Sequence, residues 1–160
     1  MVATYHRHMP EPAESTTHLG MPAWGFAFPG PLRDELTALA LDGTKTATSS
    51  LALDYVVEKA MPPRAGDREV LLDSAGRPVA IVEITKVELS TVGLVGDEFA
   101  RAEGEGFADA ADWRSAHERF WTGYIDDLRA ALRDPSFELT DSTVVVCEWL
   151  RVVERLDPPA

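Results

Sequence analysis

Residues 43–50 read GTKTATSS and place Lys45 among threonine and serine hydroxyls, directly after an amphipathic segment. Gly43 stands where a helix needs a residue that tolerates a positive φ in order to stop. Such a stop directs the next residues into a turn, where one ammonium and several hydroxyls can hold an oxyanion, a phosphate or the edge of a nucleobase. The same run also suits a solvated strand, because threonine favours strands. Both interpretations stay open from this stretch alone.

The composition predicts one globular domain without a membrane segment. A chain of 160 residues is long enough to bury a core, and no apolar run approaches the ~20 residues that span a bilayer. The N-terminus lacks the pattern of an export signal. Cys147 is the single cysteine, which excludes an internal disulfide and fits a reducing cytoplasm. We expect a cytoplasmic protein in which Cys147 is a buried structural residue.

The net charge is -12, and residues 97–160 carry 7 basic and 15 acidic side chains. This negative field disfavours extended duplex DNA and anionic lipid, because phosphate neutralisation needs clustered Lys and Arg. Arg64, Arg68 and Arg77 form either a local basic groove or scattered solvated positions. The four histidines show no ligand spacing, so neither a metal site nor a cofactor is predicted. The charge favours a small or short ligand.

The chain divides into a proline-rich leader over residues 1–22 and a single domain over 23–157. Trp24, Phe26 and Phe28 follow the leader and form either a plug that closes the core or a stacking wall beside Lys45.

The periodicity predicts helices over 31–42 and 97–103, and one long or two shorter helices over 109–133 with Gly123 as the weak point. Strands are expected over 69–73, 79–88 and 142–156, with a hairpin at 74–77. The segment 52–60 suits either a strand or a helix. Helices and strands mix without a repeated βαβ order. The sequence therefore predicts an α+β fold, a small mixed or antiparallel β-barrel with helices packed around its ends.

Two further motifs carry polar groups. Glu103-Gly104-Glu105-Gly106 sets two carboxylates in a short loop, where a carboxylate can act as a base or bind a lysine; a flexible acidic helix end is the alternative. Trp113, His117 and Trp121 share one helix face. That face is either core or the wall of a pocket.

Together these motifs resemble the ASCH domain family. The resemblance rests on Gly43-x-Lys45-x-x-Thr48, the Gly66-Asp67 turn, the Glu-Gly-Glu-Gly loop and Trp113-Arg114-x-Ala116-His117 with Phe120. It extends from about residue 26 to 121, and to most of the chain with the closing strand included. It implies a fold like that of PUA domains, with a cleft between barrel and helices that binds RNA or a modified nucleoside.

Some small bacterial members of this family resemble amidohydrolases that remove the acetyl group of N4-acetylcytidine. Their lysine, threonine and glutamate match Lys45, Thr48 and Glu103 of this sequence. The chain departs from the smallest of these enzymes by a longer leader, by its Ser49-Ser50-Leu51 continuation and by a longer helical insert over 113–133. These departures concern the substrate more than the fold.

A mechanism follows from the side chains. Lys45 can take the proton of the Thr48 hydroxyl if burial lowers the amine's basicity, and Glu103 can orient the lysine or protonate the leaving group. Ser49 and Ser50 can stabilise the oxyanion. The remaining predicted ligand-binding residues include groups for stacking on a pyrimidine: Trp24, Gly43, Thr46, Glu105, Trp113 and His117.

Two other functions stay open. One is a module that binds single-stranded RNA or a nucleotide without chemistry, with a salt-sensitive affinity. The other is a metal-independent ribonuclease in which Lys45 stabilises the phosphorane and His117 moves protons. A nucleoside-like molecule or short single-stranded RNA is the expected partner in every case. The sequence does not determine the oligomeric state.

Overall fold

The computed structural model describes residues 17–156. Six strands in this part of the chain form one sheet in the order β1-β2-β4-β5-β6-β3. β2 and β4 are parallel, and the other neighbouring strands are antiparallel. The strands are β1 (Thr17–His18), β2 (Met21–Trp24), β3 (Ala47–Leu51), β4 (Arg68–Leu72), β5 (Pro78–Thr91) and β6 (Val144–Arg155).

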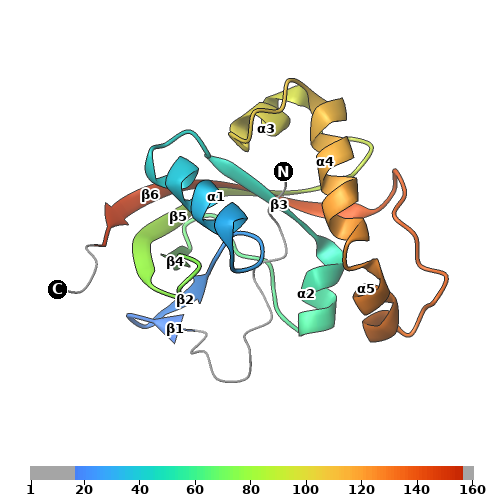
Figure 1. The fold of residues 1–160 in the computed structure, drawn as a ribbon, viewed down its shortest axis with the longest axis horizontal. Coiled ribbons are helices and arrows are strands. Elements are labelled where there is room, and N and C mark those ends of the chain that lie inside the picture. The colour runs from blue at the N-terminus through green and yellow to red at the C-terminus, as the bar shows by residue number, and fades with distance from the viewer. Residues whose placement is uncertain (1–16, 157–160) are drawn as a thin grey trace.

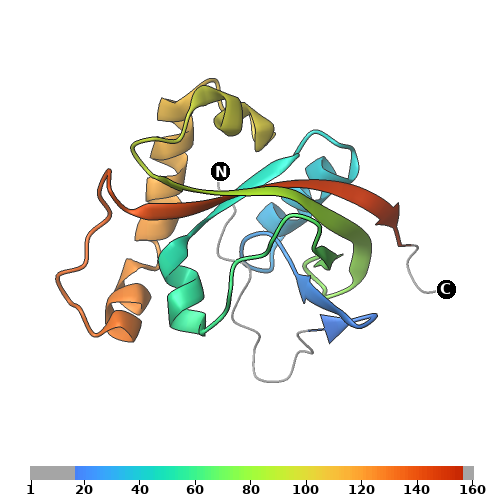
Figure 2. The ribbon, with the colours of Figure 1, turned by 180° about the vertical axis from the view of Figure 1, so that it is seen from behind.

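Five helices accompany the sheet in the described residues. They are α1 (Pro31–Leu41), α2 (Ala52–Glu58), α3 (Asp97–Ala102), α4 (Ala110–Thr122) and α5 (Ile125–Leu132). α2, α4 and α5 gather at one end of the sheet and α3 lies beside α4, whereas α1 lies over the middle of the sheet (Figure 1). From behind, the long strands β5 and β6 cross the molecule in front of α1 (Figure 2). None of these helices is long and apolar enough to cross a membrane.

The predicted α+β class is confirmed, but the predicted closure into a β-barrel is wrong. β1 and β3 are the two edge strands and do not pair with each other. β3 pairs only with the stretch of β6 from Val145 to Trp149, so the second half of β6 extends past it. Register shifts at Ile81/Val82 and Ile84/Lys86 bend the long β5–β6 ladder without joining the edges.

Most predicted elements are present within a few residues of their expected ends. The segment 109–133 forms two helices that separate at Gly123, and 52–60 contains the helix α2. Gly43 has φ 84° and ends α1, as expected of a residue that tolerates this conformation. The strand β3 begins within the stretch 43–50, so that stretch is a turn followed by a strand. Of the expected leader, residues 1–16 lie outside the described residues, and 17–22 contribute to β1 and β2.

Two hydrophobic cores lie against the sheet. The first packs Trp113, Trp121 and Phe99 from the helices on Ala47 and Cys147 of the strands. The second packs α1 and the predicted aromatic plug on the sheet, with Trp24 and Phe26 edge to face at 4.8 Å between ring centroids. The predicted burial of Cys147 is confirmed, and burial raises the pKa of its thiol to about 12. β3 therefore lies where the two cores meet.

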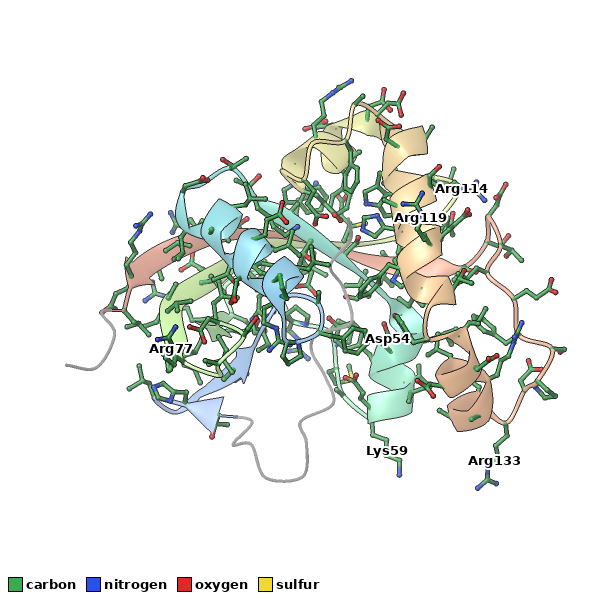
Figure 3. The ribbon with its side chains drawn as sticks, in the orientation of Figure 1. Asp54, Lys59, Arg77, Arg114, Arg119 and Arg133 are labelled. Carbon is green, nitrogen blue, oxygen red and sulfur yellow. The ribbon has the colours of Figure 1, made fainter. Side chains whose placement is uncertain are left out.

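Asp54 joins α2 to the start of α5 (Figure 3). Its side chain is buried, and its Oδ2 accepts a hydrogen bond of 3.1 Å from the Tyr124 hydroxyl. Burial raises the pKa of Asp54 to about 7, although hydrogen bonds from Tyr124 and the Leu51 backbone act in the opposite direction. The fold therefore holds Asp54 more stably in its protonated form.

We predict that Asp54→Asn makes the stability of the protein less dependent on pH between about 4 and 7. Stability from a carboxyl with a raised pKa is present below its ordinary pKa, near 4, and is lost as the pH rises through about 7. Since one pKa unit corresponds to about 1.4 kcal/mol, the native chain should lose on the order of 4 kcal/mol more than Asp54→Asn between pH 4 and pH 8. Urea unfolding at a series of pH values measures this difference. The exposed Asp127→Asn is the control, and equal pH dependence of Asp54→Asn and native protein would contradict the prediction.

Candidate functional site

The ammonium of Lys45 is buried at the centre of a cluster of charged groups. The residue is 1% exposed. Its Nζ donates to Glu105 Oε1 at 2.8 Å and to the backbone carbonyl oxygen of Glu103 at 3.1 Å, and lies 4.0 Å from Glu103 Oε2. The ring centroid of Phe26 is 5.3 Å away. A buried ammonium is tolerated only when it is paired and hydrogen-bonded, so these contacts fix its position.

The turn after α1 carries Lys45 to this place. Asp42 Oδ1 accepts from the Thr44 backbone N–H at 2.8 Å, and the Lys45 N–H donates to the Leu39 carbonyl at 3.0 Å. Thr46 then donates through its backbone N–H and its hydroxyl to the Ala102 carbonyl, at 2.9 and 3.1 Å. The turn is therefore bound both to the helix it leaves and to the end of α3.

Gly104 lets the acidic loop approach that turn. It has φ 70°, and a Cβ at this position would lie 2.4 Å from the Thr44 carbonyl oxygen and 2.7 Å from Lys45 Cα. Two backbone segments therefore meet where no side chain fits. This contact brings both glutamates of the Glu-Gly-Glu-Gly motif to one lysine.

Glu103 is an enclosed carboxylate. Its Oε1 accepts from the Ser49 hydroxyl at 2.5 Å and from Trp113 Nε1 at 3.1 Å, and its Oε2 lies 3.2 Å from His117 Nε2. Burial alone would favour the protonated acid. The charges of His117 and Lys45 and the hydrogen bonds from His117 and Ser49 outweigh burial and lower the pKa of Glu103 to about 2.

Glu105 has the opposite environment. Burial raises the pKa of its carboxyl, and the negative charge of Glu103 raises it further, whereas Lys45 and His117 act in the other direction. The pKa values of the two carboxyls are therefore shifted in opposite directions, although only one residue separates them. Such a difference distinguishes a fixed anion, Glu103, from a group that can carry a proton, Glu105.

The two faces of β3 carry different polar groups. Ser49 points toward α4 and the charged cluster, and successive side chains of a strand alternate, so Thr48 and Ser50 occupy the other face. There Thr48 is paired across the strands with the buried Glu148. The Tyr55 hydroxyl donates to Glu148 Oε1 at 2.8 Å. Sequence reasoning missed Tyr55 and Glu148; a charged residue inside the valine-rich run of β6 was the available signal for Glu148.

The structure thus places the predicted site residues in four different surroundings. The charged cluster unites six of them: Lys45, Ser49, Glu103, Glu105, Trp113 and His117. Thr48 and Ser50 lie on the opposite face of β3, and Trp24 belongs to the second core. Gly43 and Thr46 line a groove next to the turn. Lys45 is the residue that the groove and the cluster share.

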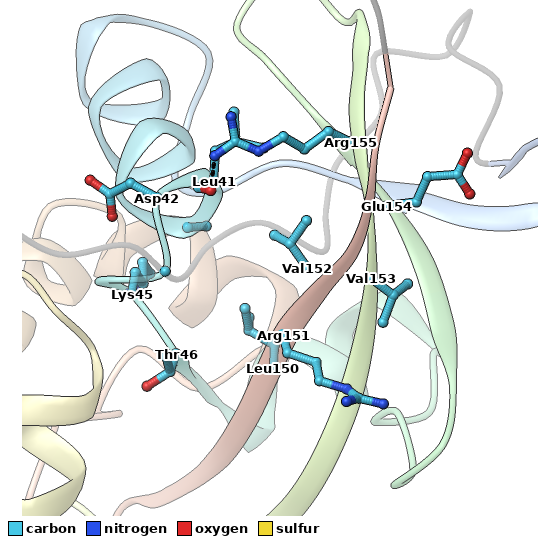
Figure 4. Close-up of a pocket in the computed structure, with 12 residues that line it drawn as sticks. Leu41, Asp42, Lys45, Thr46, Leu150, Arg151, Val152, Val153, Glu154 and Arg155 are labelled. Carbon is cyan, nitrogen blue, oxygen red and sulfur yellow. Dashed lines mark hydrogen bonds between the residues drawn. The ribbon is translucent and has the colours of Figure 1, made fainter.

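The groove has a volume of about 410 Å³. The end of α1, the turn and residues 150–155 of β6 form its walls, and the Arg155 guanidinium reaches across to the Leu41 carbonyl (Figure 4). Its lining carries Lys45, Arg151 and Arg155 against Asp42 and Glu154, which is a small excess of positive charge and no clustered basic patch. Among the described residues, no group of three or more His, Cys, Asp or Glu is arranged to hold a metal ion.

We predict that Gly104→Ala destabilises the protein by about 3 kcal/mol. The added Cβ meets the Thr44 carbonyl and also adopts a disfavoured φ. Gly106→Ala is the matched control, because Gly106 has φ 88° but open space around the Cβ position, and it should cost only about 1 kcal/mol. Urea unfolding of both variants measures the difference. Equal losses would show that the close approach of the two loops does not matter.

Comparisons with known proteins identify the family and similar folds. No curated protein matches the sequence. A crystal structure of a protein from Enterococcus faecalis V583 is similar, with 28% identity and a TM-score of 0.71 over 87% of this chain and 80% of that one. A crystal structure of an ASCH domain from Lactobacillus crispatus JV V101 has 29% identity and a TM-score of 0.71, over 82% and 79% of the two chains. The family model of the ASCH domain matches residues 23–154, and the chain therefore belongs to the ASCH domain family.

Proposed function

We propose that this protein hydrolyses the amide of an acylated pyrimidine nucleoside such as N4-acetylcytidine, with Lys45, Thr48 and Glu105 as the reacting groups. The observation that carries the proposal is the contact of 2.8 Å between the buried Lys45 ammonium and the Glu105 carboxyl. The family membership supports a ligand derived from RNA. The net charge of -12 supports a small neutral ligand over a long polyanion.

In this proposal Glu105, and not Glu103, protonates the leaving group. The sequence alone had favoured Glu103 for this role. Glu103 is held as an anion by Ser49, Trp113 and His117, whereas burial raises the pKa of Glu105. When Glu105 takes a proton from Lys45, the pair becomes a neutral amine beside a neutral acid. Such a pair supplies a base and an acid together, and its burial lowers the cost of losing the charges.

The base acts on Thr48 in this scheme. Lys45 lies next to Phe26 of the second core, which covers the sheet face that Thr48 shares with Leu150. Lys45 precedes Thr48 by three residues in the turn that leads into β3, and the proposal brings its amine to the Thr48 hydroxyl around the start of this strand. The neutral amine of Lys45 removes the hydroxyl proton as Thr48 Oγ1 attacks the acyl carbonyl.

The remaining steps balance the protons. Glu105 donates its proton to the exocyclic nitrogen as the C–N bond breaks, which releases cytidine and leaves an acyl ester on Thr48. A water molecule then attacks the ester carbonyl and the C–O bond to Thr48 breaks: one proton of the water restores the Thr48 hydroxyl, and the other leaves with the carboxylic acid, which ionises in the solvent. Phe26, whose ring centroid lies 5.3 Å from Lys45 Nζ, supplies an apolar neighbour that eases the proton transfer within the lysine–glutamate pair.

Turnover of N4-acetylcytidine by the purified protein, followed by chromatography of released cytidine, tests the proposal. We predict that Lys45→Ala, Glu105→Gln and Thr48→Val each lower kcat/KM by at least about 100-fold, a usual contribution of proton transfer. Lys59→Ala and Thr85→Val are matched controls at exposed positions and should retain activity.

Full activity of Lys45→Ala would show that Lys45 is not the base of the reaction. Absence of turnover together with salt-sensitive retention of short single-stranded RNA would favour a binding module instead. A ribonuclease that uses His117 is less consistent with the geometry, because both ring nitrogens of this buried histidine face groups of the protein. Cleavage of a labelled oligonucleotide in the presence of a chelator would instead support a metal-independent ribonuclease.

A further inference from the structure

The Glu103 carboxylate is surrounded by polar groups of the protein. Its side chain is 0% exposed. Three donors surround the carboxylate: the Ser49 hydroxyl at 2.5 Å, Trp113 Nε1 at 3.1 Å and His117 Nε2 at 3.2 Å. A carboxylate enclosed in this way keeps its charge and exchanges no proton with a substrate.

His117 is enclosed to the same degree. Its side chain is 0% exposed, and its ring stacks on Trp113 at 4.2 Å between centroids, with Phe107 and Trp121 on other sides. Stacking on apolar rings holds the imidazole in one orientation. The orientation directs each ring nitrogen at a single set of partners.

The hydrogen-bond partners of His117 indicate which of its ring nitrogens carry a hydrogen. Nδ1 lies 2.7 Å from the Trp113 carbonyl oxygen, which can only accept. Nε2 lies 3.2 Å from Glu103 Oε2 and 3.0 Å from Ser49 Oγ, whose hydrogen goes to Glu103 Oε1. Both nitrogens thus face acceptors, and hydrogen-bond accounting gives a doubly protonated imidazolium.

We propose that Glu103 and His117 are positioning residues, a buried carboxylate–imidazolium pair that holds Lys45 in place and sets the charge on Glu105. The Glu103 backbone carbonyl accepts from Lys45 Nζ, so fixing the Glu103 side chain also fixes that oxygen. The significance of the pair for turnover rests on the proposed function. The effect of the pair on the charge of Glu105 does not rest on the proposed function, because it is an interaction between groups of the protein.

Few other charged groups face the pair. The acidic loop contributes Glu105, and the turn after α1 contributes Lys45. β3 contributes the neutral Ser49, and β6 contributes Cys147, whose pKa burial and Glu103 raise to about 12, so that the thiol stays neutral. α4 contributes His117 itself and the Trp113 indole. Changes in the charge of the pair must therefore appear mainly at Glu105 and Lys45.

The two members of the pair act on Glu105 with opposite signs. Glu103 raises the pKa of Glu105 by like-charge repulsion, and His117 lowers it by attraction. Glu103→Gln should consequently shift the titration of Glu105 to lower pH, and His117→Gln should shift it to higher pH. We expect each shift to be about one pH unit, the size of a strong charge–charge effect.

Carbon-13 NMR of protein labelled at the glutamate carboxyl carbons measures this titration without any substrate. Glu105→Gln identifies the signal by removing it. Glu98→Gln, at an exposed position of α3, is the control and should leave the Glu105 titration unchanged. A purely structural role for the pair predicts no shift in either folded variant, and shifts in the same direction in both variants would also overturn the proposal.

The double variant Glu103→Gln/His117→Gln keeps the test decisive if a single variant unfolds. Each single change leaves one uncompensated buried charge and should lower the melting temperature by roughly 10 °C. The double change removes both charges, so it should recover at least half of that loss and return the Glu105 midpoint toward the native value. A double variant less stable than both singles would overturn the pairing. Shifts as predicted without turnover of any nucleoside would leave the pair established and the proposed function rejected.

Discussion

Burial of the Lys45 ammonium is the constraint on which the arrangement around β3 depends. A charged amine removed from water costs several kcal/mol even after the protein relaxes, unless acceptors replace the lost hydration. The chain supplies them from the loop after α3, as a carboxyl of Glu105 and a carbonyl of Glu103. Those groups reach the lysine because Gly104 lets two backbones touch. The turn, the acidic loop and α4 are thereby held in one relative position.

Within this cluster, similar side chains acquire different properties from their neighbours. Glu103 and Glu105 are two residues apart, yet hydrogen bonds and cations stabilise the charge of one while burial favours the acid form of the other. Asp54 resembles Glu105, because desolvation dominates there also. The number and polarity of the surrounding donors, and not the residue type alone, thus determine which carboxyl stays charged.

The sequence predicted local structure well because its signals were local. Gly43 ends α1, and Gly123 separates α4 from α5, because glycine and helix periodicity act over a few residues. The closed barrel was wrong because closure depends on which strands meet at distant edges. No pattern within β3 shows that it pairs with one neighbour only. The cluster was anticipated through its lysine, glutamates, serine and histidine, but the division of roles between Glu103 and Glu105 depends on contacts such as that of Trp113 Nε1. Strand alternation likewise separates Thr48 from Ser49.

The order of the elements along the chain has a consequence for biosynthesis. β3 emerges early, yet its single strand partner is β6, near the C-terminus. The polar contacts bridge separations of 60 residues for Lys45 and Glu105, 68 for Ser49 and His117, and 93 for Tyr55 and Glu148. Contacts between such distant segments form slowly, because a long stretch of chain must close first. On the ribosome, β3 therefore has no strand partner until residues 144–155 have left the exit tunnel, so its pairing with β6 is a late step of assembly.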